Sequence, residues 1–221
     1  LLGLRKMKKT KLVPINSIRP DLDQPRKIFD EGHISGLAKS LEVEGMINNI
    51  EVDSTGMIIT GECRWRAAKL KGWEEVPITI NSTAYSPYDR LRRQMAENVH
   101  QSGSSFDTMM NPIDVARGYA RLLSLKLKKD YQAALQSFTR TEIYGLIKQL
   151  ADEIGVTRET VYEYLKLLEE PKFVIEDITK GRPRTYYSEI VGIPEETAKT
   201  LKKKVASGDY KSREEIRQDI A

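Results

Sequence analysis

In the first hundred residues, segments with apolar side chains at helical spacing alternate with short apolar runs typical of strands. Between residues 33 and 44, apolar side chains recur at helical spacing, and Gly45 stands where a helix would end. Short apolar runs at 11–18, 47–52, 57–60 and 76–80 predict strands. A second helix is expected to begin near Glu62 and to end at Gly72. Strands that alternate with helices in this way predict a mixed α/β domain.

Beyond Pro87 the pattern becomes almost entirely helical. Helices are expected over 90–99, 113–125, 131–138, 142–153 and 158–169, with a polar loop at 101–112. One more helix is expected to begin at Glu195 and to end before Gly208. We therefore predict an α+β protein, with a mixed α/β domain over 1–100 and an all-helical domain over 101–221.

Residues 146–169 have the spacing of a helix-turn-helix. Leu150, Ile154, Val156, Val161 and Tyr164 are expected to form its core, with a glycine turn at 155 and an N-cap at 157. The residues expected to face DNA are Thr157, Arg158, Glu159, Thr160, Tyr162, Glu163 and Lys166. The alternative is an ordinary helical hairpin, because acidic residues outnumber basic ones here. A glutamate can, however, accept a hydrogen bond from cytosine N4, so the acidic residues are compatible with DNA reading.

Composition and charge exclude some kinds of site but do not show what the protein binds. A net charge of +4 over 221 residues is compatible with nucleic-acid binding but does not require it. The single cysteine, Cys63, excludes an internal disulfide and a cysteine-based zinc site, which fits a reducing cytoplasm. The basic segments 126–129 and 179–184 are either DNA-backbone contacts or solvated charge, and the sequence leaves both open. His33 and His100 are expected at the surface or at helix caps.

The turn Gly61-Glu62-Cys63-Arg64 links a predicted strand to a basic helix. A helix that begins directly after a strand presents unsatisfied backbone N–H groups and a positive end, which together attract anions. Gly61 would let a ligand approach the backbone closely, and Arg64 has the geometry to form two bonds to one phosphate. The same pattern also fits a basic amphipathic helix without a ligand.

The order of several motifs resembles the ParB family of chromosome and plasmid partition proteins. They are DQPRKIFD at 23–30, ISGLAKSLEVEGMINNIEV at 34–52, GECRWRAAKLKGWEEVPITI at 61–80, MAENVHQS at 95–102, NPIDVARGYARLL at 111–123 and the helix-turn-helix. The resemblance implies a DNA-binding clamp that binds CTP in its N-terminal domain and loads at a centromere-like site. It also implies a Walker-type partition ATPase as partner, which the N-terminal tail contacts in the family. The basic run at 5–9 is therefore either such a partner contact or disordered, solvated charge, and the sequence leaves both open. The location implied is the cytoplasm, on the nucleoid or a plasmid.

The same resemblance implies the residues of a nucleotide pocket. The residues carried over are Gln24, Arg26, Gly61, Glu62, Cys63, Arg64, Glu97 and Asn98. Glu97 and Asn98 would also serve a Mg²⁺ ion. Two positions depart from the family, since Cys63 and Gln101 stand where the family has arginines. Because both changes remove positive charge, we expect weak nucleotide binding, another nucleotide preference or no hydrolysis.

Other functions on the same fold remain open in the sequence, including whether the chain is an enzyme. Sulfiredoxin places a reactive cysteine at the position of Cys63, and a helix N-terminus beside Arg64 would lower the pKa of such a thiol. A nucleotide-dependent kinase and a ParB-like transcription or nucleoid-occlusion factor are further alternatives. The resemblance also implies self-association. We expect the C-terminal dimerisation domain of the family to be absent from this chain.

Overall fold

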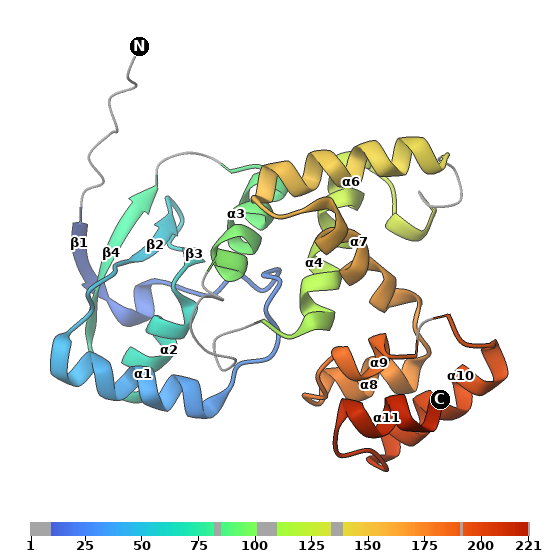
Figure 1. Cartoon of the computed structure of the whole chain (residues 1–221). Coiled ribbons are helices and arrows are strands. Elements are labelled where there is room, and N and C mark those ends of the chain that lie inside the picture. Colours follow the sequence, from blue (N-terminus) through green and yellow to red (C-terminus); the bar gives the residue numbers. More distant parts are fainter. Residues whose placement is uncertain (1–9, 82–84, 101–109, 134–138, 191, 221) are drawn as a thin grey trace.

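The computed structural model describes residues 10–81, 85–100, 110–133, 139–190 and 192–220 (Figure 1). The fold is of the α+β class, as predicted. The described residues contain a mixed sheet of four strands, in the order β1-β4-β2-β3. These strands are β1 (Thr10–Pro14), β2 (Ile50–Asp53), β3 (Ile58–Thr60) and β4 (Glu75–Asn81). Strand β4 pairs parallel with β2, and both outer pairings are antiparallel.

Helices α1 (Glu31–Glu44) and α2 (Glu62–Leu70) pack against each other and against the sheet. Helix α1 ends at Gly45, whose φ of 69° lies in the left-handed region that glycine adopts readily. Trp65 and Trp73 pack on the same core, and the Trp65 indole donates to the carbonyl of Ile15 at 3.1 Å. Both helices lie where the sequence pattern predicted them.

Two predicted strands are shorter than expected. The first stops at Pro14 and continues as a 3₁₀ turn (Ile15–Ser17), where the Ser17 hydroxyl donates to the Pro14 carbonyl at 2.6 Å. The second begins at Ile50 rather than at residue 47. Its preceding carbonyls, on Asn48 and Asn49, accept hydrogen bonds from Arg64 instead of from a neighbouring strand. The side chain of Arg64, from the following helix, therefore marks the start of β2.

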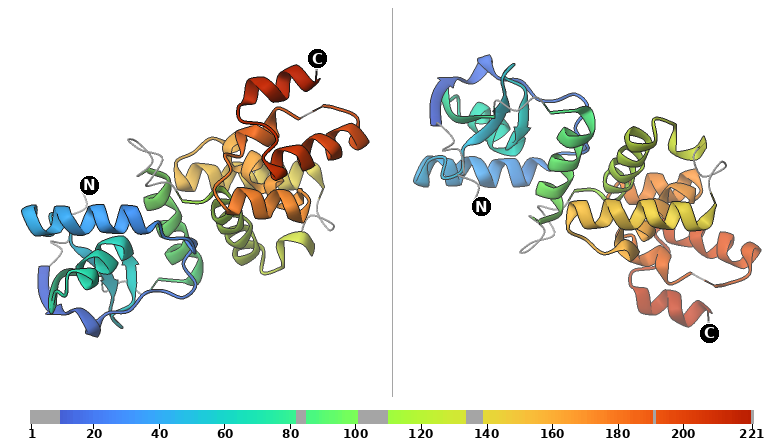
Figure 2. Two further views of the ribbon diagram at one scale, coloured as in Figure 1. Left: turned by 90° about the horizontal axis from the view of Figure 1, so that it is seen from below. Right: turned by 90° about the horizontal axis from the view of Figure 1, so that it is seen from above.

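A second core joins α3 (Pro87–His100), α4 (Pro112–Leu127), α6 (Arg140–Ile154) and α7 (Arg158–Lys166). The 3₁₀ turn Leu167–Glu169 follows α7, and its Leu167 packs in a third core. Figure 2 shows α3 between the sheet and the other helices. Leu91 and Met95 of α3 are buried in this helical core. The division into domains at residue 100 therefore remains a prediction. Of the helix expected over 131–138, residues 131–133 are helical and the remainder lies outside the described residues.

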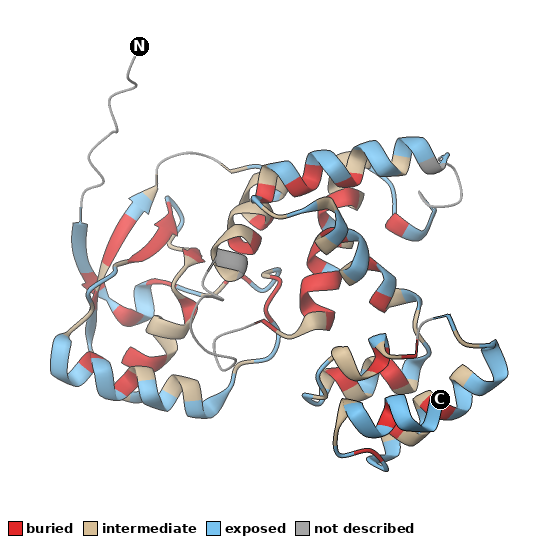
Figure 3. Ribbon diagram, in the orientation of Figure 1, coloured by how far each residue is buried: buried red, intermediate tan, exposed pale blue. Residues whose placement is uncertain are grey.

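A third core lies in the last fifty residues, where only one helix was predicted. It contains α8 (Lys172–Thr179), α9 (Thr185–Ser188), α10 (Glu195–Ser207) and α11 (Arg213–Ile220), packed with Ile113 and Ala116 of α4 (Figure 3). Helix α10 has the predicted bounds and ends at Gly208. The other three are too short to repeat an apolar period, which is why the pattern did not reveal them. None of the helices described is long and apolar enough to cross a membrane.

Gly118 allows α4 to approach α3 closely. A Cβ at this position would lie 2.4 Å from Sδ of Met95, which is fully buried. We expect Gly118→Ala to lower the free energy of unfolding by about 1 kcal/mol, because the buried methionine must shift. In a Met95→Ala background the same change should become neutral or stabilising, since alanine has the higher helix propensity. Urea unfolding of the wild type, the two single variants and the double variant tests this, and equal effects of Gly118→Ala in both backgrounds would contradict it.

Candidate nucleotide pocket and candidate DNA-binding helix

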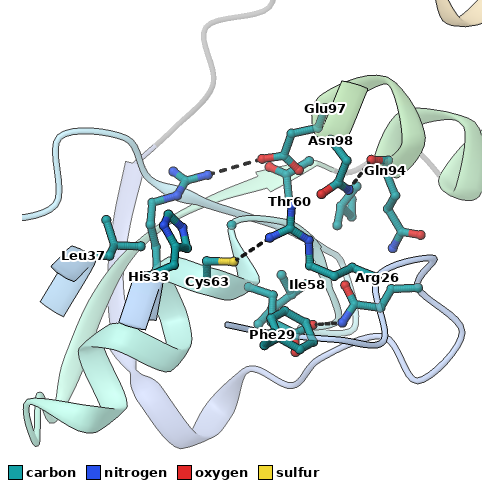
Figure 4. A pocket seen from close by; sticks show the side chains of 15 residues that line it. Arg26, Phe29, His33, Leu37, Ile58, Thr60, Cys63, Gln94, Glu97 and Asn98 are labelled. Carbon is teal, nitrogen blue, oxygen red and sulfur yellow. Dashed lines mark hydrogen bonds and ion pairs between the residues drawn. The ribbon is translucent and has the colours of Figure 1, made fainter. Parts of the chain in front are cut away.

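A pocket of about 280 Å³ lies between the loop before α1, the start of α2 and the last turns of α3 (Figure 4). Its lining residues are Gln24, Arg26, Phe29, His33, Leu37, Ile58, Ile59, Thr60, Gly61, Glu62, Cys63, Arg64, Gln94, Glu97 and Asn98. All eight residues that the sequence proposed for a nucleotide site are among them. The structure thus brings together three segments that lie far apart in the chain.

The N-terminus of α2 forms one wall of this pocket. Gly61 is its N-cap with φ of 95°, and no described side chain caps the helix there. A Cβ on Gly61 would lie 2.8 Å from Nη2 of Arg64, so both the backbone conformation and the space favour glycine. The uncapped N–H groups of the first turn are suited to bind an anion.

Arg64 is already engaged by the protein. Its Nη1 donates to the carbonyl of Asn49 at 2.8 Å and to that of Asn48, and its Nη2 lies 3.6 Å from Oε1 of Glu97. Burial lowers the pKa of Arg64. The guanidinium therefore ties α2 to the start of β2 and to the end of α3. Its role as a phosphate ligand stays a prediction, because a phosphate would have to replace or share these partners.

Glu62 connects the loop before α1 to α2. One carboxylate oxygen accepts from Gln24, and the other accepts from Nε of Arg66 at 2.8 Å. The Arg66 guanidinium in turn lies 3.8 Å above the ring of Phe29. Burial raises the pKa of the Glu62 carboxyl. These contacts fix the loop that carries Gln24 and Arg26 beside the helix start.

Cys63 does not have the environment of a reactive thiol. Burial raises the pKa of the Cys63 thiol, and the nearby Glu62 and Glu97 add to this effect. Arg26, whose Nη1 lies 3.5 Å from the sulfur, lowers the pKa of the thiol, but the effect of burial is larger. The expectation of a lowered thiol pKa was therefore wrong. That expectation was based on the helix N-terminus and Arg64. It left out the desolvation of the thiol by tertiary packing, which raises the pKa.

Glu97 and Asn98 lie at the rim of the pocket on the last turn of α3. Glu97 pairs with Arg64, and the Asn98 amide donates to the backbone carbonyl of Gln94 at 2.7 Å. In the described part of the chain, no group of three or more His, Cys, Asp or Glu side chains is placed to hold a metal ion. One carboxylate and one amide oxygen nevertheless fit Mg²⁺ that takes its other ligands from phosphates and water. The magnesium site stays a prediction.

Several pocket residues were not proposed from the sequence. Phe29, Leu37, Ile58, Ile59, Thr60 and Gln94 were not considered, and His33 was expected only at the surface or at a cap. The backbone N–H of His33 does bond the Asp30 carboxylate at the N-cap of α1, but its ring also lines the pocket. Gln94 lies one helical turn before Asn98, and that i, i+4 spacing would have revealed it.

The predicted helix-turn-helix is present in α6 and α7. Gly155 has φ of 83° at the turn, and the Thr157 hydroxyl accepts from the backbone N–H of Thr160 at 3.1 Å. Val161 and Leu165 are buried against α4 and α6, whereas Val156 and Tyr164 are only partly buried on the same core. The opposite side of α7 is exposed. We call the four exposed residues on it the exposed stripe: Glu159, Tyr162, Glu163 and Lys166.

Cations around α7 rest on aromatic rings. The Arg158 guanidinium lies 4.1 Å from the ring centroid of Tyr144 and pairs with Glu159, and the Lys166 ammonium lies 4.8 Å from that of Tyr162. Arg158 is about one-third exposed, and Tyr162 is 49% exposed. These residues are accessible, as DNA contact requires.

The two basic segments near the helix-turn-helix are partly engaged by carboxylates. Lys126 pairs with Glu153 at 2.7 Å, Arg182 pairs with Asp177, and Arg184 pairs with Glu163. Whether these segments contact DNA phosphates therefore stays a prediction. The basic run at 5–9 and Gln101 lie outside the described residues.

The fold defines a class: a protein with a helix-turn-helix and, apart from it, a pocket beside a mixed sheet. Residues 4–99 match the family model of the ParB N-terminal domain. The chain is 32% identical to the chromosome-partitioning protein ParB of Myxococcus xanthus over 162 residues, 72% of this chain and 46% of that protein. It is 31% identical to the nucleoid occlusion protein of Geobacillus sp. (strain WCH70), over 74% of this chain and 51% of that protein.

A solved structure with a TM-score above 0.5 shows the same fold. The C-terminally truncated chromosome-partitioning protein ParB from Caulobacter crescentus, complexed to the centromeric parS site, aligns with a TM-score of 0.56 and 24% identity. The alignment covers 94% of this chain and 97% of that chain. Another structure of the truncated Caulobacter crescentus protein, complexed with CTP-gamma-S, aligns with a TM-score of 0.40. The chain belongs to the ParB family, and it spans about half the length of the Myxococcus and Geobacillus relatives.

Proposed function

We propose that this chain is a DNA-binding partition protein. In this proposal, α7 recognises a centromere-like duplex site, and the protein links that site to a Walker-type partition ATPase during plasmid or chromosome segregation. It would act in the cytoplasm, on the nucleoid or a plasmid, and would self-associate. The observation that carries the proposal is the exposed stripe of α7, held outward by buried Val161 and Leu165. The name of the Myxococcus relative, a chromosome-partitioning protein, supports it.

The chemistry of α7 suits the major groove. A helix entering the groove presents its first residues to base edges, and its positive end faces phosphates. Arg158 and Lys166 are accessible cations for the backbone, while Tyr162 and the glutamates of the exposed stripe are available to bases. The stacking of both cations on tyrosine rings limits their rotamers before DNA arrives, which lowers the entropy cost of binding.

The pocket is proposed to bind a nucleotide, with CTP as the candidate. The uncapped α2 N-terminus would receive phosphates beside Arg26, and Glu97 and Asn98 would hold Mg²⁺, which neutralises phosphate charge. Cys63 supplies no positive charge, and the buried carboxylate of Glu62 lines the same cavity. We therefore propose a weaker nucleotide interaction than a pocket with an arginine at position 63 would have.

A nucleoid-occlusion or transcription factor is the second candidate. It is favoured by the similarity to nucleoid occlusion proteins, and it would use the same α7 chemistry at another site. The thiol-catalyst alternative has lost its physical support, because burial raises the pKa of Cys63. Selection of bound duplexes from a random pool, with and without CTP and magnesium, tests the proposed function. Failure to bind any duplex at low salt would exclude both DNA-binding candidates.

Arg158→Ala should weaken binding to the selected duplex by about tenfold, because it removes a charge-assisted contact at the start of α7. Arg117→Ala is the matched control, since this arginine is 59% exposed on α4 and pairs with Asp114 of the same helix. Fluorescence anisotropy with labelled duplex measures both affinities. Equal losses of duplex affinity in the two variants would mean that Arg158 contributes only to the net charge of the protein and makes no specific contact with DNA.

Arg64→Ala should weaken nucleotide binding while leaving recognition of the isolated DNA site largely intact. The substitution frees Glu97 and the start of β2, which Arg64 holds around the pocket, and α7 lies in a different core. Calorimetric titration with CTP and magnesium measures the effect. Equal CTP affinity of the wild type and the variant would contradict the assignment of this pocket.

A further inference from the structure

Glu163 has an unusual place for an acidic residue on a helix proposed to enter DNA. Its side chain is 58% exposed and lies on the exposed stripe of α7, with Glu159 one turn before it and Lys166 one turn after it. A carboxylate there would repel phosphates unless its charge is balanced or its oxygens bond to a base. The structure supplies the first of these conditions from a distant part of the chain.

Arg184 is the residue that balances Glu163. It comes from the loop before α9, and its Nη1 and Nη2 lie 3.3 and 3.4 Å from one oxygen of Glu163, Oε2. Within the described part of the chain, no hydrogen bond reaches the other oxygen, Oε1. Because Arg184 approaches from one side only, Oε1 keeps its lone pairs available while the net charge of the pair is close to zero.

Arg184 is itself held by packing that leads back to the core. Its guanidinium lies 4.7 Å from the ring centroid of Tyr164. Tyr164 makes an edge-on contact with Tyr119 at 6.0 Å and 81° between ring planes. Tyr119 is fully buried in α4. A continuous line of contacts thus runs from the helical core to the carboxylate of Glu163, and each contact restricts the next side chain.

We infer that Arg184 is a specificity-determining positioning residue, which orients Glu163 so that its free oxygen accepts a hydrogen bond from an exocyclic amino group in the major groove. This inference rests on the proposed DNA-binding function. Cytosine N4 is the amino group that carboxylates characteristically accept from, whereas adenine is better matched by amides, which also donate to N7. Glu163 therefore reads cytosine, and Arg184 contacts no base.

Arg182 provides a matched control within the same loop. It also pairs with a carboxylate, that of Asp177 at 3.1 Å, and it also lies over a tyrosine ring, that of Tyr186 at 5.6 Å. Both of these partners lie outside α7. Replacing Arg182 or Arg184 by alanine removes the same charge and the same kind of stacking contact. Only the Arg184 change releases Glu163.

The test uses the duplex selected by the wild-type chain and its three single-base variants at each position. Arg184→Ala and Glu163→Gln should each reduce discrimination at one common cytosine position by about tenfold. The double variant should lose no more than either single variant, because the two residues act as one unit. Arg182→Ala should keep the wild-type base preference and lose affinity equally for every sequence. Arg184→Lys keeps the charge without the planar fork and should restore part of the discrimination.

Different failures are distinguishable. If wild type binds no duplex, the proposed function fails and this inference falls with it. If wild type binds selectively but Arg184→Ala only loses affinity uniformly, as Arg182→Ala does, Arg184 is a phosphate contact and the inference is overturned. Unchanged base preference in Glu163→Gln overturns it as well. Thermal melting of each variant confirms that the compared proteins are folded.

Discussion

Replacing Leu165 by alanine is expected to lower the free energy of unfolding by about 2–5 kcal/mol. Leu165 is 2% exposed and lies on the inner face of α7, in one core with Leu150, Ile154 and Val161. Truncating it leaves a cavity at the contact that holds α7 against α4 and α6. Duplex affinity should fall as well, because the exposed stripe is positioned only while α7 is docked. Urea unfolding measures the stability change.

The neighbouring residue is the control for this prediction. Lys166→Ala changes an exposed side chain, so its effect on stability should stay within about 0.5 kcal/mol. Its duplex affinity should nevertheless fall, with a smaller dependence on salt, if Lys166 contacts a phosphate. A loss of stability below about 1 kcal/mol for Leu165→Ala would mean that α7 is not held by this core.

Replacing Asp114 by alanine is expected to destabilise the protein by about 2–3 kcal/mol and to weaken nucleotide binding. Asp114 is 2% exposed at the start of α4, and its Oδ2 accepts from the backbone N–H groups of Lys27 at 2.9 Å and Ile28 at 3.4 Å. It therefore fastens the loop that carries Arg26 to α4. Without the carboxylate these N–H groups lose their partner, and the loop is released from the pocket wall.

Asp114→Asn is the conservative comparison, since the amide keeps one oxygen acceptor in the same place. It should retain most of the CTP affinity, whereas Asp114→Ala should lose it beyond what the change in stability explains. Calorimetric titration at a temperature where both variants are folded measures this. If both variants bind CTP as wild type does, Asp114 has no part in positioning the pocket.

Much of the secondary structure could be predicted from the sequence because caps and glycine stops mark the ends of several helices. Gly155 and Gly208 each end a helix in the left-handed conformation, and Gly45 ends one with a positive φ of 69°. Thr157 begins a helix with its own side chain as the N-cap. Each of these effects acts within a few residues, so it leaves a mark in the sequence. Strand ends were less accurate. The start of β2 depends on Arg64, which lies in the following helix.

The pocket residues were found for a different reason. Gln24, Gly61 and Glu97 lie far apart in the chain, and no periodicity connects them; the resemblance to ParB grouped them, and the structure places them around one cavity. Phe29 was not proposed and His33 was expected only at the surface or at a cap, because their places in the pocket come from how α1 and the loop before it pack beside α2. The binding of a nucleotide by these residues remains a proposal.

The sequence by itself determined the α+β class, the helix-turn-helix and the membership of a family, because these follow from local periodicity, caps and motif order. Only the tertiary structure decided the chemical state of individual groups. Burial raises the pKa of Cys63, whereas the sequence had suggested the reverse. Arg184 reaches Glu163 across 21 positions of the chain. Desolvation and contacts between distant residues arise only when the chain is packed, which is why they have no local signature.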